Sequence, residues 1–315
     1  MSKFIGLVRN EHMKTFRRLS TWILLGILLG MFILIAGITK YYAEDGGNWR
    51  QSSEQQVAEL QKQAEQTEDP VYAASLQEDM AVLQYQLDND IAPIQTDSVL
   101  GFMLDALLNC GPFLIMFIAI IAGGMVSNEF STGTIKLLLT KTPSRFSVLT
   151  SKYVSMLFTT FLFTVAFLLF SFIVGVIFFG FDGLTASRVV LDNGEIVKES
   201  GLGALSRDIG YGFIQVAFYG TIAFALSTLF RNSALAIGFS IFIALFFPTI
   251  SYLIARYDWS KYILFNNLDL SAYTPGNTPI VDGMTLGFSV VVMLVYFIII
   301  TAITWLSFIK RDVTA

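Results

Sequence analysis

Six long apolar stretches alternate with polar segments along the 315-residue chain. Each stretch is long enough to cross the hydrocarbon core of a bilayer, which takes about 20 apolar residues in a helix. Backbone groups in lipid must bond within their own segment, so the stretches are predicted to be α-helices. The predicted transmembrane spans are 21–39, 102–126, 153–179, 209–230, 234–254 and 284–308. The pattern therefore predicts an all-α integral membrane protein.

The segment before the first span, residues 1–20, has a helical pattern of its own. Its apolar and aromatic positions recur every three or four residues, and its basic positions fall on the other face. The two sets are Ile5, Val8, His12, Phe16 and Leu19 against Lys3, Lys14, Arg17 and Arg18. This favours an amphipathic elbow helix in the membrane interface. The alternative is an ordinary basic flank that fixes the topology.

The polar segment 43–100 contains two runs with apolar residues at helical spacing, separated by Thr67-Glu68-Asp69-Pro70. Asp69 can cap a helix whose first residue is Pro70, because proline fits the first helical position. We therefore expect an antiparallel helical hairpin outside the membrane. The alternative interpretation is a solvated spacer.

Two further segments between spans carry local signals. In 180–208, Asn193-Gly194 between apolar runs predicts a small β-hairpin in which Leu191 faces Ile196 and Arg188 faces Glu199. In 255–283 an apolar stretch is too short to span the membrane. It is consistent either with a re-entrant segment or with a surface helix.

The distribution of charge predicts the orientation of the spans. With the N-terminus inside, the cytoplasmic segments are 1–20, 127–152, 231–233 and 309–315, and they hold 12 of the 20 Lys and Arg residues. Basic residues favour the cytoplasmic side. The sequence thus predicts a multi-pass protein of the plasma membrane with both termini in the cytoplasm.

Composition removes several classes of function. Charged residues make up 14% of the chain, against about 25% in a typical soluble domain. Cys110 and His12 are the only cysteine and histidine, which excludes an internal disulfide, a zinc site of the usual ligands and a Ser-His-Asp or Cys-His catalytic site. The chain has no phosphate-binding loop of the form GxxxxGK[ST]. We expect no enzyme activity, and no metal or cofactor, in this chain.

The predicted span interiors lack ionisable residues, and Asp105 lies at the mouth of a span. Proton and ion pathways usually require such groups, so a proton-coupled carrier is disfavoured.

The segment 127–152 carries the most informative pattern. Ile135, Leu138 and Leu139 form a short apolar stripe, Gly133 permits a sharp change of backbone direction before it, and Pro143 ends it. A short amphipathic helix at the inner face of a membrane can lodge in a groove of a soluble partner. A basic loop that only sets topology would need the Lys and Arg residues alone.

This segment resembles the coupling loop of the type-two family of ABC export permeases. The similarity rests on Glu-x-x-x-Gly-Thr-x-x-x-Leu-Leu followed by Pro-Ser-Arg and then by Lys152 at the next helix, and on the layout of the whole chain. The matching positions are Glu129, Gly133, Thr134, Lys136, Pro143 and Arg145. The resemblance implies that this loop docks on a separate ATPase. It also implies two ATPase copies, which carry the ATP and Mg²⁺, and a second permease, either another copy or a related chain.

The expected function is therefore the membrane-spanning subunit of an ATP-driven exporter for a hydrophobic or amphipathic substrate, such as an antimicrobial peptide, a lipid or a drug. The expected partners are protein and membrane lipid, with no nucleic acid. An alternative is a sensory or regulatory membrane protein whose outer segment binds a ligand without transport.

Overall fold

The structure is a computed structural model in which the described residues are 2–42, 49–134, 144–192, 194–230 and 232–310. Within them, six helical stretches are long and apolar enough to cross a membrane, which confirms the predicted fold class. They are α2 (Leu19–Tyr42), α5 (Val99–Met125) with its short continuation α6 (Ser127–Ser131), α8 (Arg145–Phe179), α9 (Gly201–Leu229), α10 (Ser233–Ile254) and α11 (Leu286–Lys310).

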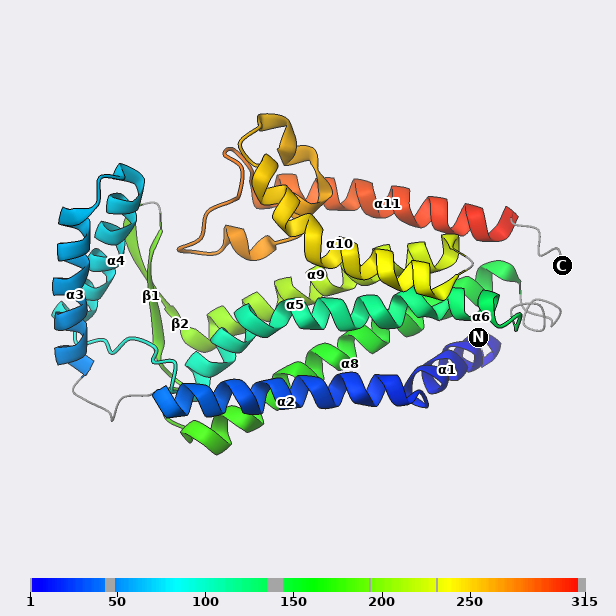
Figure 1. The fold of residues 1–315 in the computed structure, drawn as a ribbon, viewed down its shortest axis with the longest axis horizontal. Helices are drawn as coiled ribbons and strands as arrows, with labels where there is room; N and C mark the ends of the chain where they lie inside the picture. Colours follow the sequence, from blue (N-terminus) through cyan, green and yellow to red (C-terminus); the bar gives the residue numbers. More distant parts are fainter. Residues whose placement is uncertain (1, 43–48, 135–143, 193, 231, 311–315) are drawn as a thin grey trace.

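These helices run roughly lengthwise in one elongated bundle (Figure 1), with α5 packed against α8, α9 and α10. Two hairpins lie at one end of the bundle, which we call the hairpin end: α3 (Trp49–Gln66) with α4 (Pro70–Asp88), and β1 (Ser187–Asp192) with β2 (Glu195–Ser200). The N-terminal helix α1 (Ser2–Phe16), α6 and the last turn of α11 lie at the other end, called the terminus end.

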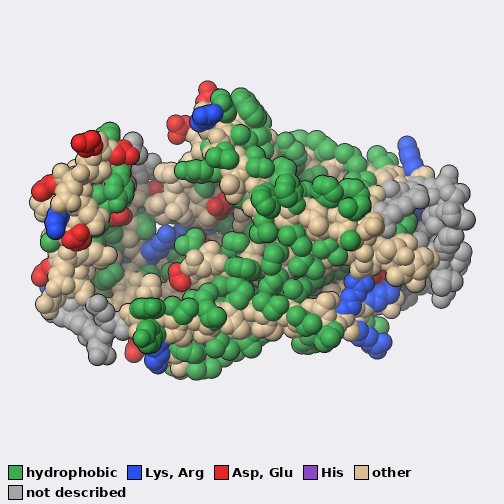
Figure 2. Space-filling view, in the orientation of Figure 1, with side chains coloured by type: hydrophobic (Ala, Val, Ile, Leu, Met, Phe, Trp, Pro, Cys, Tyr) green, Lys and Arg blue, Asp and Glu red, His purple; other side chains and the backbone are tan. Residues whose placement is uncertain are grey.

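The bundle core is aromatic and aliphatic. Phe32 of α2 is fully buried, and its ring meets Phe102 of α5 and Phe167 of α8 edge-on, with centroids 6.4 and 5.0 Å away. The outward faces are also apolar, as in Ile298, whose exposed fraction is 63%. Figure 2 shows hydrophobic side chains along the length of the bundle. An apolar outer surface of this extent suits a helix bundle whose solvent is lipid.

The helical hairpin forms as its turn sequence predicts. The carboxylate of Asp69 accepts a hydrogen bond from the backbone N–H of Tyr72, and Pro70 is the first residue of α4. Helix α3 packs against α4, and Leu76 of α4 is buried. The cap and the proline together fix where the second helix begins.

The β-hairpin has the predicted register. Leu191 pairs with Ile196 and Arg188 with Glu199, because a two-residue turn at 193–194 fixes which residues face each other. Asn193 lies outside the described residues, and Gly194 has the positive φ of 83° that glycine tolerates. The β-hairpin does not stand alone, since β1 packs against α4.

The segment between α10 and α11 contains three short 3₁₀ helices: η1 (Asp258–Tyr262), η2 (Leu264–Asn267) and η3 (Leu270–Tyr273). Leu268 is buried, and η2 packs against α10 and α11. Asn267 accepts a hydrogen bond of 2.7 Å from Ser289 of α11. The apolar stretch thus packs on the bundle instead of forming the single surface helix that one interpretation expected.

The elbow helix exists, but a different face of it is buried. Helix α1 ends at Phe16, and α2 begins at Leu19 after a bend held by a 2.6 Å hydrogen bond from Thr21 Oγ1 to the carbonyl of Thr15. Ile5 and Leu19 of the predicted apolar face are 62% and 74% exposed within the chain, as they would be if this face met lipid, so the interfacial position stays a prediction. The polar residues Glu11 and Thr15 are buried against the bundle, and the next subsection gives the reason.

Candidate functional site

Four charged residues meet at the terminus end, and we call them the buried ion network: Glu11, Lys14, Glu129 and Lys152. They come from α1, α6 and α8. The side chain of Lys152 is fully buried, those of Glu11 and Glu129 are 8% and 11% exposed, and that of Lys14 is 38% exposed. Charge at this depth is rare in proteins unless it is paired.

The geometry pairs every charge with two of opposite sign. Lys152 Nζ lies 2.6 Å from Glu11 Oε2 and 2.7 Å from Glu129 Oε1. Lys14 Nζ lies 2.7 Å from Glu11 Oε1 and 3.1 Å from Glu129 Oε1. The two carboxylates and two ammonium groups sum to zero, so the network can be buried without a net charge.

The neighbouring charges keep Glu11 and Lys14 ionised. Burial of Glu11 favours its neutral form, but the ammonium groups of Lys152 and Lys14 outweigh burial, so the pKa of Glu11 lies below its ordinary value. Burial also disfavours the charged form of Lys14, but the carboxylates of Glu11 and Glu129 outweigh it and raise the Lys14 pKa. Both shifts stabilise the charged forms at neutral pH.

The network explains why α1 buries its polar face. Helix α1 packs along α8, and Glu11 is the residue that reaches Lys152, 141 positions later in the sequence. His12, beside it, lies between the rings of Phe16 and Phe158, with centroids 4.6 and 4.9 Å away. Burial lowers the pKa of His12, which therefore fills an aromatic surface as a neutral ring.

Glu129 and Lys152 also stand on either side of the predicted coupling segment. The chain leaves α6 through Thr132, whose hydroxyl donates a 2.7 Å hydrogen bond to the carbonyl of Asn128. Gly133 then has a positive φ of 70°, the change of direction that the sequence predicts there. The exposed residues Gly133 and Thr134 lead into the segment, and α8 begins on its far side at Arg145.

The junction of α5 and α6 is fixed by a serine of another helix. Ser227 Oγ of α9 accepts 3.0 Å hydrogen bonds from the backbone N–H groups of Val126 and Ser127, where the helical ladder is interrupted. Ser127 Oγ in turn donates to the carbonyl of Gly123 at 2.6 Å. These bonds satisfy backbone donors that a helix break would otherwise leave unpaired in the interior.

The first turns of α8 are joined to the C-terminal end of α11. Arg145 donates a 3.0 Å hydrogen bond to the carbonyl of Ile309, and the indole N–H of Trp305 donates to the hydroxyl of Thr150 at 3.1 Å. A guanidinium at the last carbonyls of a helix satisfies acceptors that have no helical donor. The start of α8 is thus fixed to α1, α6 and α11 together.

The structure describes four of the nine residues predicted for ATPase coupling. It brings Glu129 into the buried ion network, exposes Gly133 and Thr134, and places Arg145 at the start of α8. The other five, Ile135, Lys136, Leu138, Leu139 and Pro143, lie outside the described residues.

Sequence reasoning missed Glu11, Lys14 and Ser227 as members of the site, and it included Lys152 in the resemblance without a partner. It took 127–152 as one loop and began the third span at 153, whereas α8 starts at Arg145 and carries Lys152 inside the bundle. The available signal was Glu11, an acidic residue in a basic helix, which needs a basic partner when that helix packs.

The buried ion network joins three helices through paired charges. Among the described residues, no group of three or more His, Cys, Asp or Glu side chains is placed to hold a metal ion. Each carboxylate of the network is neutralised by lysine. Removing Lys152 would leave both buried carboxylates with Lys14 as their only basic partner in the network, so the three helices are expected to move as one unit.

Taken together, the fold defines a multi-pass membrane protein with transmembrane helices. Residues 70–314 match the profile of the family described as "Protein of unknown function (DUF2705)", and the chain belongs to that family.

Two relatives come from Bacillus subtilis (strain 168). One, "Uncharacterized protein YhcI", is 35% identical over 314 residues, which cover 98% of this chain and 99% of that protein. The other, "Uncharacterized membrane protein YdbK", is 30% identical over 196 residues, which cover 62% of this chain and 75% of that protein.

Proposed function

We propose that this chain is the permease subunit of an ATP-driven exporter, and that its segment 132–144 docks on a separate ATPase. The observation that carries the proposal is the position of this segment. Its flanks are joined to each other by the 2.7 Å pair of Glu129 and Lys152, and to α1 through Glu11. A loop that only fixed topology would not need a buried charge network at its base.

The network offers a physical route for coupling. A force on the segment 132–144 acts on α6 and α8 at once, because their ends are paired through Glu129 and Lys152. Helix α1 follows through Glu11, and α9 through Ser227. A partner that pushes on this segment thereby acts on several helices of the bundle without any chemistry in this chain.

The proposal includes an orientation and a stoichiometry. The terminus end, with its excess of basic residues, faces the cytoplasm, and the hairpin end, where acidic side chains gather in Figure 2, faces outward. Two ATPase copies bind ATP and Mg²⁺, and a second permease, identical or related, completes the complex. The sequence resemblance supports these partners.

The test is purification of the tagged full chain from membranes of its native host. The expected result is co-purification of a protein that contains a GxxxxGK[ST] sequence and hydrolyses ATP. In Leu138→Asp a buried apolar contact of about 1.5–3 kcal/mol is replaced by a charge, so at least about ten-fold less ATPase should be recovered.

The matched control is Leu202→Asp at the hairpin end, where the leucine is 43% exposed and the new charge falls in the first turn of α9. This variant should retain the ATPase. Equal recovery with both variants would refute docking at 132–144. Absence of any ATPase from the wild-type preparation would favour the sensory alternative.

A further inference from the structure

A cavity of about 810 Å³ lies between α5, α8, α9 and α10, and residues of α4 and β1 also line it. Its deeper walls are apolar and include the buried residues Ile115, Phe167 and Val216. Cavities of about 300–1,000 Å³ with walls of this kind hold small organic molecules.

The charges around the cavity are unbalanced. Asp105, Asp208 and Asp269 line it together with one basic residue, Arg188. Asp208 is neutralised by Arg188 and Arg207 at 3.6 and 3.4 Å. This pairing leaves Asp105 and Asp269 as the unmatched charges of the wall.

These two carboxylates accept only neutral donors. Asp105 Oδ1 accepts a 2.8 Å hydrogen bond from the amide of Asn109, and Asp269 Oδ1 accepts from Ser271. Neither forms an ion pair with another described residue. The cavity is therefore negatively charged.

Two prolines add backbone acceptors to the same cavity. Pro112 lies inside α5 and Pro248 inside α10, and both line the cavity. Proline has no N–H, so the carbonyl four residues earlier loses its helical donor. Those carbonyls belong to Leu108 and Ala244, which also line the cavity. Two lining residues thus have backbone carbonyls without their helical donors.

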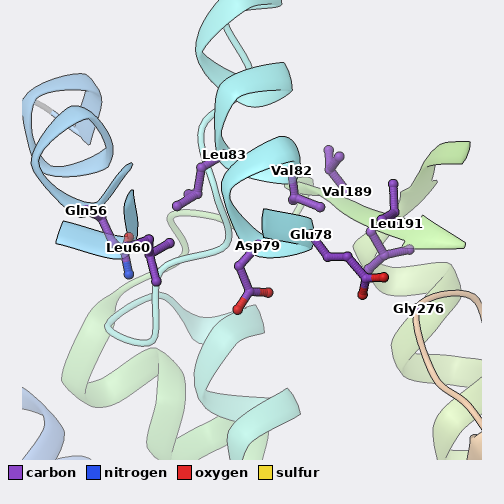
Figure 3. Close-up of a pocket in the computed structure, with 10 residues that line it drawn as sticks. Gln56, Leu60, Glu78, Asp79, Val82, Leu83, Val189, Leu191 and Gly276 are labelled. Atoms are coloured by element: carbon purple, nitrogen blue, oxygen red, sulfur yellow. The ribbon is translucent and has the colours of Figure 1, made fainter. Parts of the chain in front are cut away.

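A second hollow of about 380 Å³ lies on the other side of the contact between α4 and β1. Val82 and Val189 line both spaces. Figure 3 shows Glu78 pointing from α4 toward Leu191 of β1, with Asp79 on the same helix. Within the part of the chain that the structure describes, no basic residue lines this hollow, so the space next to the cavity has the same acidic and apolar character.

We propose that the 810 Å³ cavity binds a drug-sized organic cation with a large apolar body, and that this is the substrate class of the exporter. The cationic group pairs with Asp105 and Asp269, and the apolar body is buried against the deeper walls. The transport role rests on the proposed function, whereas binding to the cavity does not.

The probe is tetraphenylphosphonium, with tetraphenylborate as its control of the same shape and opposite charge. Binding of both ions is measured on the purified full chain in nanodiscs, without any ATPase. The cation should bind saturably and the anion should not. Equal binding of both ions would mean simple apolar partitioning and would overturn the proposal.

Two variants test the carboxylates. Asp105→Asn and Asp269→Asn should each weaken cation binding about five-fold, and the double variant about 25-fold, because each removes one charge pair at a partly exposed site. The control is Glu65→Gln on α3, an exposed acid far from the cavity lining, which should bind the cation as the wild type does. Unchanged binding by the double variant would contradict the proposal.

A steric pair on α9 gives an independent test. Gly212 lines the cavity, and a Cβ there would have its nearest neighbour, Leu107, 3.9 Å away. Gly210 does not line it, and a Cβ there meets nothing within 4 Å. Gly212→Phe should reduce cation binding more than ten-fold, because the new ring fills part of the cavity and removes a large area of apolar contact with the cation. Gly210→Phe should leave cation binding unchanged.

The outcomes separate this proposal from the proposed function. Cation binding that follows the cavity variants in a chain that recruits no ATPase would keep the site and reject the exporter. If the chain recruits the ATPase but binds the cation equally well in all cavity variants, the exporter proposal is kept and the site is rejected.

Discussion

Two clusters of four charges stabilise opposite ends of the molecule, and each has two acids and two bases. The buried ion network at the terminus end joins α1, α6 and α8, which are up to 141 residues apart in sequence. The hairpin-end ion cluster consists of Arg188, Glu199, Arg207 and Asp208, which lie close together in sequence.

Burial is the main difference between the two clusters. Side chains of the hairpin-end ion cluster are 14–27% exposed, whereas Lys152 of the buried ion network is fully buried. Water can replace a lost partner in the first cluster, whereas in the second it can reach Lys14 but not the fully buried Lys152. The same charge composition is therefore expected to contribute little to stability at the hairpin end. At the terminus end it is expected to be required for the packing of helices that are distant in sequence.

The largest expected effect is that of Lys152→Met. It leaves Glu11 and Glu129 buried with only Lys14 nearby, so α1 should lose about 3 kcal/mol of docking free energy, the low end of the range for a broken buried pair. Trypsin cleavage at Arg17–Arg18 and the thermal unfolding midpoint in nanodiscs measure the effect. Arg188→Met at the hairpin-end ion cluster is the control, and equal effects of the two changes would contradict the comparison.

Removing the two carboxylates sharpens the same comparison. When Glu11→Leu and Glu129→Leu are added to Lys152→Met, the one charge of the network that remains is Lys14, whose side chain is 38% exposed and can reach water. Apolar replacement of a whole buried network is often neutral for stability, so most of the loss should be recovered. If the triple variant is as unstable as the single one, packing of Lys152 matters more than its charge. ATPase coupling should stay impaired in the triple variant.

The next effect concerns the hydrogen bonds beside the network. Ser227→Ala removes the acceptor of the Val126 and Ser127 N–H groups and should cost about 1–3 kcal/mol. Ser206→Ala, which removes an exposed hydroxyl near the hairpin end, should change stability by less than about 0.5 kcal/mol. Chemical unfolding of the two purified variants compares them, and a silent Ser227→Ala would show that the α5–α6 break needs no side-chain acceptor.

The pH dependence of α1 docking follows from the direction of three pKa shifts. The Glu11 pKa is lowered, so its stabilisation is present above the ordinary value of 4.5 and is lost as pH falls through the lower folded value. The Lys14 pKa is raised, so its stabilisation is present below 10.5 and is lost as pH rises through the higher folded value. Amide exchange of residues 2–16, corrected for intrinsic rates, should be constant between about pH 7 and 10, and should rise as the pH falls below the ordinary His12 value of 6.5, because the pKa of His12 is also lowered. A transition near pH 8 would contradict it.

The smallest effect is expected at the hairpin-end ion cluster. Arg207 donates to both carboxylate oxygens of Glu199, at 2.7 and 3.2 Å, but the pair is partly exposed. Arg207→Met should therefore cost at most about 1 kcal/mol, and less at high salt. A loss as large as that of Lys152→Met would remove the distinction between the two ends.

Local features of the fold could be predicted from the sequence. The register of the β-hairpin follows from a two-residue turn, and the start of α4 from Asp69 before Pro70, because neighbouring residues determine both. The transmembrane spans follow from the length and apolar composition of each stretch. Gly133 was likewise predicted from its own conformational freedom.

The candidate site could be predicted only in part. Glu129 was identified through the family resemblance, but its partners were not, because pairing with Glu11 and Lys152 depends on how α1 packs against α8. The hydropathy pattern also placed Lys152 outside the third span, because it ends a span at the first charge even when the helix continues. Long-range pairing of charges is a property of packing and leaves no periodic pattern.

The most direct test of the central claim is photocrosslinking from the segment 132–144 in living cells of the native host. A photoreactive phenylalanine analogue replaces Leu138, and the control carries it at Leu202. The account predicts a crosslink from position 138, and none from 202, to a protein that mass spectrometry identifies by its GxxxxGK[ST] peptide. A chain that crosslinks to no ATPase from position 138, while ATPase is present in the same membranes, would contradict it.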